Sequence, residues 1–314
     1  MYQNFIGIDI GKTEIFLAIY HKSDVCVYTN DIAGFQQLHE DHALTLANSL
    51  VVLETTGGYE TALIQYLQKH AYSVHRANTR KVKNFIRSYG VLGKSDNMDA
   101  KMLAAYGAER HASLDLFIEN PCKKLLKLAN RRSDLTQMLI QEKNRLQAPD
   151  QIDVLDSIKV IIEVLKQQIK KIDEKIENIY KQDALLAQKK EVLKTVPGLG
   201  DIISTNLLAF MPELGFANRK QIASLGGVAP HPNESGKKIG YRCTRGGRAN
   251  VKRMLFMAAM TAARSNSILG EFYHRLVAAG KKKMVALTAL MRKILVIANA
   301  RLRDFYQEIE QATT

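Results

Sequence analysis

The sequence predicts an α/β domain at the N-terminus, a helical coiled-coil arm in the middle and a mainly α-helical domain at the C-terminus. Short apolar runs alternate with helical patterns in the first third, Ile and Leu recur at heptad spacing in the middle, and apolar helices follow in the last third. A length of 314 residues suggests about two domains. The divisions that we expect are 1–115, 116–190 and 191–314.

The N-terminal third combines strand and helix signals. Turn residues separate three consecutive runs that are typical of strands. These runs are followed by a helical pattern, a buried apolar strand that ends in an acid, and a helix–strand–helix series. In order, the expected elements are strands Asn4–Ile10, Glu14–Tyr20 and Asp24–Tyr28, a helix over 33–48, strand Leu50–Glu54, helix Tyr59–His70, strand Tyr72–Arg76 and a helix from Asp96 to about Tyr106. This order indicates a layered α/β domain with a mixed sheet.

The middle of the chain carries a heptad pattern. Apolar residues are spaced alternately four and three apart, with Lys and Glu on the remaining faces, and they are Ile158, Ile162, Leu165, Ile169, Ile172, Ile176 and Ile179. Residues 121–148 are also helical in pattern and form the expected antiparallel partner. Two interpretations stay open: an extended arm that dimerises, or a long helix that packs on its own domain.

The last third begins with a glycine-rich turn. Val196–Gly200 reads VPGLG and precedes an apolar helix, Ile202–Phe210. Gly198 and Gly200 would expose backbone N–H groups at a helix N-terminus, where a phosphate binds favourably. The turn resembles the hairpin of helix-hairpin-helix DNA-binding modules, and a plain turn before a helix is the alternative. Further helices are expected near Val251–Ser265 and Met284–Asp304.

The excess positive charge is concentrated in the same third. The formal net charge is +14, and residues 191–314 hold 19 basic against 8 acidic residues, a net of +11. Its densest stretch contains no acid and several glycines, whose bare backbone lets a phosphate approach. We expect double-stranded DNA as the partner, bound by Lys237, Lys238, Arg242, Arg245, Arg248, Lys252 and Arg253 together with Gly198 and Gly200.

Other features argue against secretion and membrane insertion. Only three cysteines occur, widely spaced, so neither a disulfide framework nor a Cys-rich zinc site is expected. The first apolar stretch is short and contains Asp9, and the late run 284–300 is interrupted by Arg292 and Lys293. We therefore expect a cytoplasmic, nucleoid-associated bacterial protein without a membrane partner.

Four carboxylates form a recognisable series. Asp9 lies inside the first strand, Glu54 ends the fourth, and Asp96 and Asp99 are three residues apart at a helix start. Taken singly, each has a structural explanation, such as a helix cap for Asp96. In this order they match an RNase H-like nuclease site. Clustered carboxylates need cations to stay ionised, and a pair of Mg²⁺ ions that clamps a phosphodiester is the chemical solution.

These pieces together resemble a known family. The segments FIGIDIGKTEIFLAI, VVLETTGGYE, LGKSDNMDAKMLA, VPGLGDIISTNLLAF and IASLGGVAPHPNESGKKI occur in order over residues 5–265. They are similar to the DEDD transposases and site-specific recombinases of the IS110 group of insertion sequences, which includes pilin-gene invertases. The resemblance implies a RuvC-like N-terminal domain, a coiled-coil linker and a C-terminal transposase domain. It places the family's four acids on Asp9, Glu54, Asp96 and Asp99.

The resemblance also implies a serine nucleophile, which falls on Ser235 in the segment NESGKK. A serine hydroxyl needs a base or a metal to attack a phosphate, and nearby cations would balance the charge of the transition state. The resemblance further implies a guide RNA that pairs with DNA. Because the acids and Ser235 lie in separate domains, we expect a homo-oligomer, a dimer or tetramer, with a composite site.

Two other functional classes fit parts of the sequence. Residues 7–13 resemble the first phosphate loop of actin-like kinases and ATPases, but that class does not explain the basic C-terminal third. A non-catalytic DNA-binding protein on a degenerate nuclease fold is the other alternative, and the presence of all four acids argues against it. Within the recombinase class, the protein sequence does not separate transposition from DNA inversion.

Overall fold

The computed structural model describes residues 2–90, 93, 95–149, 152–236, 238–240 and 242–313. The chain forms two compact units, Met1–Glu119 and Asn120–Thr314. The first is a mixed α/β unit and the second is mostly helical. The expected arm, 116–190, belongs to the second unit from Asn120 onward, and the division of the chain into three parts stays a prediction.

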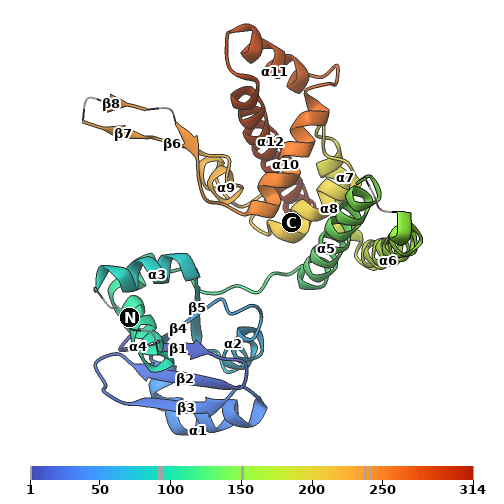
Figure 1. The fold of residues 1–314 in the computed structure, drawn as a ribbon. Helices are drawn as coiled ribbons and strands as arrows, with labels where there is room; N and C mark the ends of the chain where they lie inside the picture. Colours follow the sequence, from blue (N-terminus) through green and yellow to red (C-terminus); the bar gives the residue numbers. More distant parts are fainter. Residues whose placement is uncertain are drawn as a thin grey trace. The chain divides into compact units, whose positions relative to one another are not determined.

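A five-stranded mixed sheet forms the centre of the first unit (Figure 1). The strand order is β3-β2-β1-β4-β5, with β2 antiparallel to both of its neighbours, β1 and β3, and with β1, β4 and β5 parallel. The strands are β1 (Asn4–Ile10), β2 (Glu14–Ile19), β3 (Val25–Thr29), β4 (Ser49–Glu54) and β5 (Ser73–Ala77). This confirms the expected mixed sheet and is consistent with an RNase H-like domain.

Helices cover both faces of this sheet. The alternation along β4 shows the two sides, because Val51 and Leu53 belong to one buried cluster and Leu50 and Val52 to another. The first cluster includes residues of α1 and α2, and the second includes residues of α3 and α4. The helices are α1 (Ile32–Ala47), α2 (Glu60–Lys69), α3 (Thr79–Ser88) and α4 (Asp96–Arg110), followed by a short 3-10 turn, His111–Ser113.

Helix α4 crosses the sheet at very close range, and Gly7 of β1 makes this possible. A Cβ atom at Gly7 would lie 2.1 Å from the carbonyl oxygen of Ala100 and 2.3 Å from the backbone nitrogen of Ala104. A glycine on the helix also permits this close packing, because a Cβ atom on Gly107 of α4 would lie 2.8 Å from a methyl group of Val52 in β4. The helix backbone therefore rests almost directly on β1 and β4.

Most elements of this unit were expected from the sequence, and α3 was not. Its segment TRKVKNFIRS is strongly polar, and only Val82 and Phe85, three residues apart, are buried. Two apolar residues are too few to show helical periodicity against so many charges.

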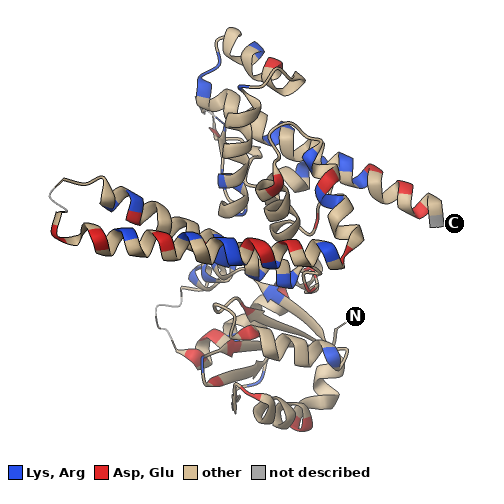
Figure 2. Cartoon of the chain, turned by 90° about the vertical axis from the view of Figure 1, so that its right-hand side faces the viewer, with Lys and Arg blue, Asp and Glu red and all other residues tan. Residues whose placement is uncertain are grey.

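The second unit begins with two long helices that pack against each other, α5 (Lys123–Leu146) and α6 (Leu155–Gln182), with a 3-10 turn, Ile152–Val154, between them. Ile158, Ile162 and Leu165 of the heptad series are buried. An ion pair joins the helices, with Arg132 Nε 2.6 Å from Asp173 Oδ1. Lys, Arg, Asp and Glu alternate along the outer faces (Figure 2). Within one chain α5 is thus the partner of α6, while the coiled-coil arm and its role in dimerisation stay predictions.

The remaining helices share one large core. They are α7 (Ala184–Lys194), α8 (Asp201–Phe210), α9 (Arg219–Leu225), α10 (Ala249–Ala262), α11 (Ile268–Ala278) and α12 (Lys283–Thr313). Leu255 of α10 and Leu290 and Ile294 of α12 are completely buried in it. In the described part of the chain, no helix is long and apolar enough to cross a membrane.

Between α9 and α10 the basic stretch forms a hairpin built in two steps (Figure 1). At its base β6 (Pro230–His231) pairs antiparallel with β9 (Cys243–Thr244). Further out, β7 (Glu234–Ser235) pairs antiparallel with β8 (Lys238–Ile239). The sequence predicted a basic, glycine-rich DNA-binding stretch here but no strands, because strands of two residues are too short to show alternation.

We predict that Gly7→Ala strongly destabilises the first unit, by about 3 kcal/mol or more, because the added methyl group meets the backbone of α4, which has no rotamer to relax into. Denaturant unfolding of the full chain measures this. Gly200→Ala is the matched control, since a Cβ atom there has no neighbour within 4 Å. Equal stability of the two variants would contradict the close packing.

Candidate functional site

The structure brings the four predicted acids to one side of the sheet. Asp9 follows Ile8 in β1, Glu54 follows Leu53 in β4, and Ile8 and Leu53 are paired in the parallel register. Ile6, Ile8 and Ile10 face the cluster that contains α1 and α2. Asp9 and Glu54 therefore alternate to the opposite face, which α4 covers. Asp96 and Asp99 belong to the first turn of α4.

The electrostatics of Asp9 show how close these groups are. The pKa of the Asp9 carboxyl is raised from 3.8 to about 6, mainly because the group is partly buried and also because of the negative charges of Asp99, Asp96 and Glu54. The backbone N–H of Ile10 donates to it and opposes the rise. Four carboxylates that repel one another in a partly buried place favour the binding of a cation.

Helix α4 is capped at its N-terminus by Ser95 and not by one of the acids. The hydroxyl oxygen of Ser95 accepts a hydrogen bond from the backbone N–H of Met98, at 3.3 Å. The cap interpretation considered for Asp96 is therefore wrong, since Asp96 lies one residue inside the helix. Asp96 is exposed and Asp99 is partly buried. Both carboxylates interact favourably with the positive end of the helix dipole, which offsets part of their mutual repulsion.

The donor set suits a hard cation that keeps some of its water. Among the residues that the structure describes, no three His, Cys, Asp or Glu side chains are grouped tightly enough to hold a metal ion as they stand. The negative charges of the other three acids act on Asp9, but the four acids do not form a closed cage. Mg²⁺ typically binds through one or two carboxylates and retains several water molecules, so an open set of oxygen donors fits it.

Ser235 is the last residue of β7, at the tip of the hairpin. Its backbone pairs with Lys238, and Gly236 follows it in a turn. Gly236 has a φ angle of +54°, which glycine adopts without steric cost. Lys237, one of the predicted DNA contacts, lies outside the described residues, as do the side chains of Ser235 and Lys238. The acids belong to the first unit and Ser235 to the second.

The predicted basic residues around the hairpin differ in how they are used. Arg245 is exposed, Lys252 Nζ donates to Thr244 Oγ1 at 3.0 Å, and Arg253 donates to Asn250 Oδ1 at 3.5 Å. Arg242 lies 3.7 Å from Glu234. Arg248 is different, because it forms a two-pronged ion pair with Glu213 and also donates to the carbonyl oxygen of Phe210. Its positive charge is thus balanced inside the fold.

The turn before α8 has a structural use as well as the predicted binding role. Gly198 has a φ angle of +92°, and a Cβ atom on it would lie 2.4 Å from the carbonyl oxygen of Ala258 in α10. Packing alone therefore requires glycine at this position. Gly200 is the N-cap residue of α8, and no atom lies within 4 Å of the place of its missing Cβ. Its phosphate-binding role and the helix-hairpin-helix assignment stay predictions.

One basic surface was missed by sequence reasoning. Helix α3 exposes Arg80, Lys81, Lys83 and Arg87 and contains no acid, although the first 110 residues have no net charge. Its first residue, Thr79, donates from Oγ1 to the carbonyl oxygen of Thr55 at 3.3 Å. Helix α3 therefore begins beside the strand end that carries Glu54. The signal was present, since this is the densest run of cations in the first unit.

Two family models match the chain. The model of DEDD transposases of the IS110 type matches residues 6–158, and the model of the IS116/IS110/IS902 transposase family matches residues 190–274. The first range contains the four acids and the second contains Ser235.

Similar curated proteins agree with these models. The pilin gene-inverting proteins of Moraxella bovis and Moraxella lacunata are each 28% identical to the chain. Each alignment covers 97% of this chain and 97% of the similar protein. An insertion element IS116 protein of Streptomyces clavuligerus is 26% identical over 142 residues, which is 45% of this chain and 35% of that protein.

We predict that Asp9→Asn stabilises the metal-free protein at neutral pH. The folded protein holds the Asp9 proton more tightly than the unfolded chain, so this contribution to stability is lost as the pH rises from about 4 to about 6. The amide removes that loss, and we expect a gain on the order of 1 kcal/mol near pH 7 after solvent screening.

Thermal unfolding at several pH values measures this gain, which should vanish below about pH 4. Asp24→Asn is the control, because Asp24 is an exposed acid in the turn before β3. A difference between Asp9→Asn and wild type that does not change with pH would contradict the electrostatic coupling.

Proposed function

The chain belongs to the IS110 family of DEDD transposases and site-specific recombinases, and from this membership we propose that it cleaves and rejoins double-stranded DNA at a metal centre formed by Asp9, Glu54, Asp96 and Asp99. The proposal is supported chiefly by the placement of the acids, because Asp9 and Glu54 lie near the ends of paired strands on the face that α4 covers and α4 carries the other two acids in its first turn. The contribution of these acids to the raised pKa of Asp9 agrees with this placement. Family membership also decides against the nucleotide-kinase interpretation of residues 7–13.

The acids would act through bound Mg²⁺. Asp9 and Glu54 lie near the ends of neighbouring strands and would bind the ions from the sheet. Asp96 and Asp99 would bind them from the first turn of α4. When bound, a pair of Mg²⁺ ions supplies positive charge to the oxygens of a phosphodiester during exchange. The protein's part is to fix the carboxylates in place, and the bound cations would lower the pKa of Asp9 and so keep it ionised.

Ser235 would be the nucleophile. Its Oγ would bond to the phosphorus of a DNA phosphodiester, the bond from phosphorus to one deoxyribose oxygen would break, and that oxygen would leave with the proton of the serine. One phosphoester replaces another, so the energy of the bond is conserved for rejoining and no nucleotide cofactor is consumed. The hairpin supports this role, since its backbone places Ser235 next to a tight turn with Gly236.

We further propose that the working enzyme is a homo-oligomer. The acids and Ser235 lie in different compact units, and a composite centre would combine acids from one subunit with the serine of another. A structured guide RNA belongs to the proposal as the partner that the resemblance implies. Its backbone would need cationic surface, and the second unit supplies it.

One comparison favours inversion as the biological reaction. The pilin gene-inverting proteins align with the chain over nearly its whole length, whereas the IS116 insertion element protein aligns over less than half of it. The DNA around the gene distinguishes the two products, because an invertible segment indicates inversion and element ends indicate transposition.

We predict that Ser235→Ala abolishes the covalent protein–DNA adduct and DNA exchange, because the attacking oxygen is removed. The measurement uses a plasmid that carries the gene with its native flanking DNA, incubated with the protein and Mg²⁺ and analysed for protein-linked strands. Asp99→Asn should also lose the adduct, through loss of metal binding. Ser224→Ala, an exposed serine of the same unit, is the matched control. An adduct that survives in Ser235→Ala would rule out this nucleophile.

We predict that the double variant Lys81→Gln, Lys83→Gln weakens DNA binding, because α3 would contact backbone phosphates beside the acidic centre. The plot of log affinity against log salt should become less steep by about 1 to 2, the number of lost phosphate contacts. The control is Lys22→Gln, Lys69→Gln, which removes the same charge from exposed positions elsewhere in the unit. An identical loss in both double variants would show that only net charge matters.

A further inference from the structure

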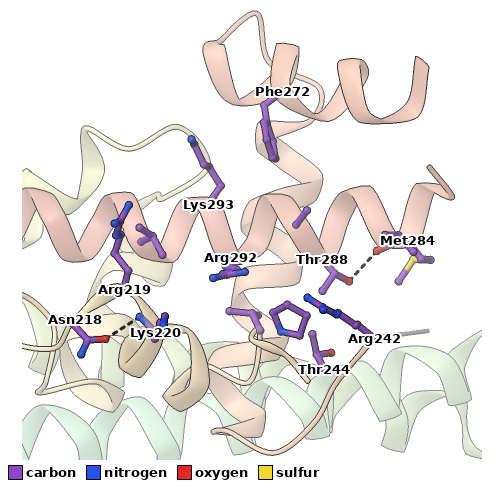
Figure 3. A pocket seen from close by; sticks show the side chains of 15 residues that line it. Asn218, Arg219, Lys220, Arg242, Thr244, Phe272, Met284, Thr288, Arg292 and Lys293 are labelled. Atoms are coloured by element: carbon purple, nitrogen blue, oxygen red, sulfur yellow. Dashed lines mark hydrogen bonds between the residues drawn. The ribbon is translucent and has the colours of Figure 1, made fainter. Parts of the chain in front are cut away.

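A pocket of about 1070 Å³ lies in the second unit between α9, the base of the hairpin, α11 and α12 (Figure 3). Its lining has a positive and an apolar part. The positive part consists of Arg219, Lys220, Arg242, Arg292 and Lys293. Figure 3 shows Phe272 descending into the pocket from α11, with Arg292 and Arg242 below it.

The positive charge of this pocket is largely unbalanced. No Asp or Glu is among its described lining residues. Only Arg242 has a carboxylate near it, Glu234 at 3.7 Å, within the set of ion pairs described for these five cations. Further positive charge is adjacent in the sequence, because Lys281, Lys282 and Lys283 directly precede Met284 of the lining. An anionic ligand is therefore favoured.

The apolar part of the lining favours a ligand that has apolar surface as well as negative charge. Met284 and Val285 of the lining are 59% and 55% exposed, although both are large apolar side chains. The ring of Phe272 is partly buried, and Lys293 Nζ lies 5.6 Å from its centroid. Apolar and aromatic surface beside cations matches a ligand that combines flat apolar faces with negative charge.

Nucleic acid has both properties only when its bases are accessible. In a duplex the base faces are stacked inside, so the backbone offers phosphates alone. An unpaired strand exposes base faces that stack on aromatic side chains while its phosphates follow a basic groove. The volume is at the upper end of typical small-ligand pockets, which leaves room for more than one nucleotide.

We propose that this pocket binds an unpaired stretch of nucleic acid, with bases against Phe272, Met284 and Val285 and phosphates on Arg292, Lys293 and Arg219. The inference rests on the proposed function, since strand exchange exposes unpaired nucleotides. Arg242 and Thr244 of the lining lie at the base of the hairpin that carries Ser235, on the side that follows Ser235 in the sequence. Nucleic acid bound in the pocket would therefore contact the base of that hairpin. DNA and RNA share this chemistry, and the test separates them.

The test measures fluorescence anisotropy of the full chain with three probes: oligothymidylate of about 12 nucleotides, oligouridylate of equal length and a duplex of equal length. Phe272→Ala should weaken binding of an unpaired probe about tenfold and leave duplex binding within about twofold. A loss for oligothymidylate assigns DNA to the pocket, a loss for oligouridylate assigns RNA, and a loss for both assigns either strand. Ile268→Ala, an 80% exposed apolar residue of the same helix outside the lining, should change nothing.

A second variant protects the test against misfolding, because Phe272 packs partly against the core. Ala289→Glu places a negative charge in the pocket on the surface of α12, and Ala289→Gln places a group of similar size without charge. The Glu variant should lose unpaired-strand binding at an unchanged melting temperature, and the Gln variant should lose less.

Two results with the variants would overturn the inference. One is unpaired-strand binding at the wild-type level in both Phe272→Ala and Ala289→Glu. The other is displacement of the probe by polyglutamate together with equal affinity of Phe272→Ala and wild type, which would indicate an acidic peptide site. A wild-type protein that exchanges DNA but binds no unpaired probe would refute the pocket alone. A protein that neither cleaves nor binds any nucleic acid would refute the proposed function as well.

Discussion

The contact between Gly7 and the backbone of α4 is the constraint on which the candidate metal centre depends. Any side chain at Gly7 would collide with Ala100 and Ala104, so glycine alone lets the helix lie directly on β1. Asp96 is one helical turn before Ala100, and Asp9 is two residues after Gly7. The same close approach that packs the helix therefore brings its first turn to the strand ends. The packing of α4 and the position of the acids in its first turn therefore depend on the same contact, although Gly7 itself has no side chain that could bind metal or substrate.

This arrangement trades stability for function. The raised pKa of Asp9 disfavours the folded state at neutral pH, because the ionised carboxyl is partly buried beside other negative charges. A bound cation would offset this cost. The basic surfaces of the chain would bind the phosphates of the DNA substrate. Helix α3 exposes a basic face beside the acidic centre, and the last third of the chain carries a net charge of +11. Acidic and basic surfaces thus have different tasks: the first would hold metal and the second would hold phosphate.

Much of this could be predicted from the sequence, and the failures have physical reasons. The strands of the first unit are apolar runs bounded by turns, and the acids at Asp9 and Glu54 stand out because each interrupts or ends such a run. Helix α3 was missed because two buried residues leave no periodicity. The hairpin was missed because its paired strands are two residues long. Pairing across long sequence distances is also invisible in a local pattern, so the ion pair of Arg248 with Glu213 and the pocket around Phe272 emerge only in three dimensions.

The metal centre that we propose requires Asp9, Glu54, Asp96 and Asp99 to bind divalent cations jointly. The most direct measurement is anomalous X-ray diffraction from crystals of the protein grown with Mn²⁺, which replaces Mg²⁺ at oxygen-donor sites. We expect anomalous peaks between the ends of β1 and β4 and the first turn of α4, in contact with carboxylate oxygens from the strands and from the helix. An empty centre in crystals that bind Mn²⁺ elsewhere, or peaks held by other residues, would contradict it.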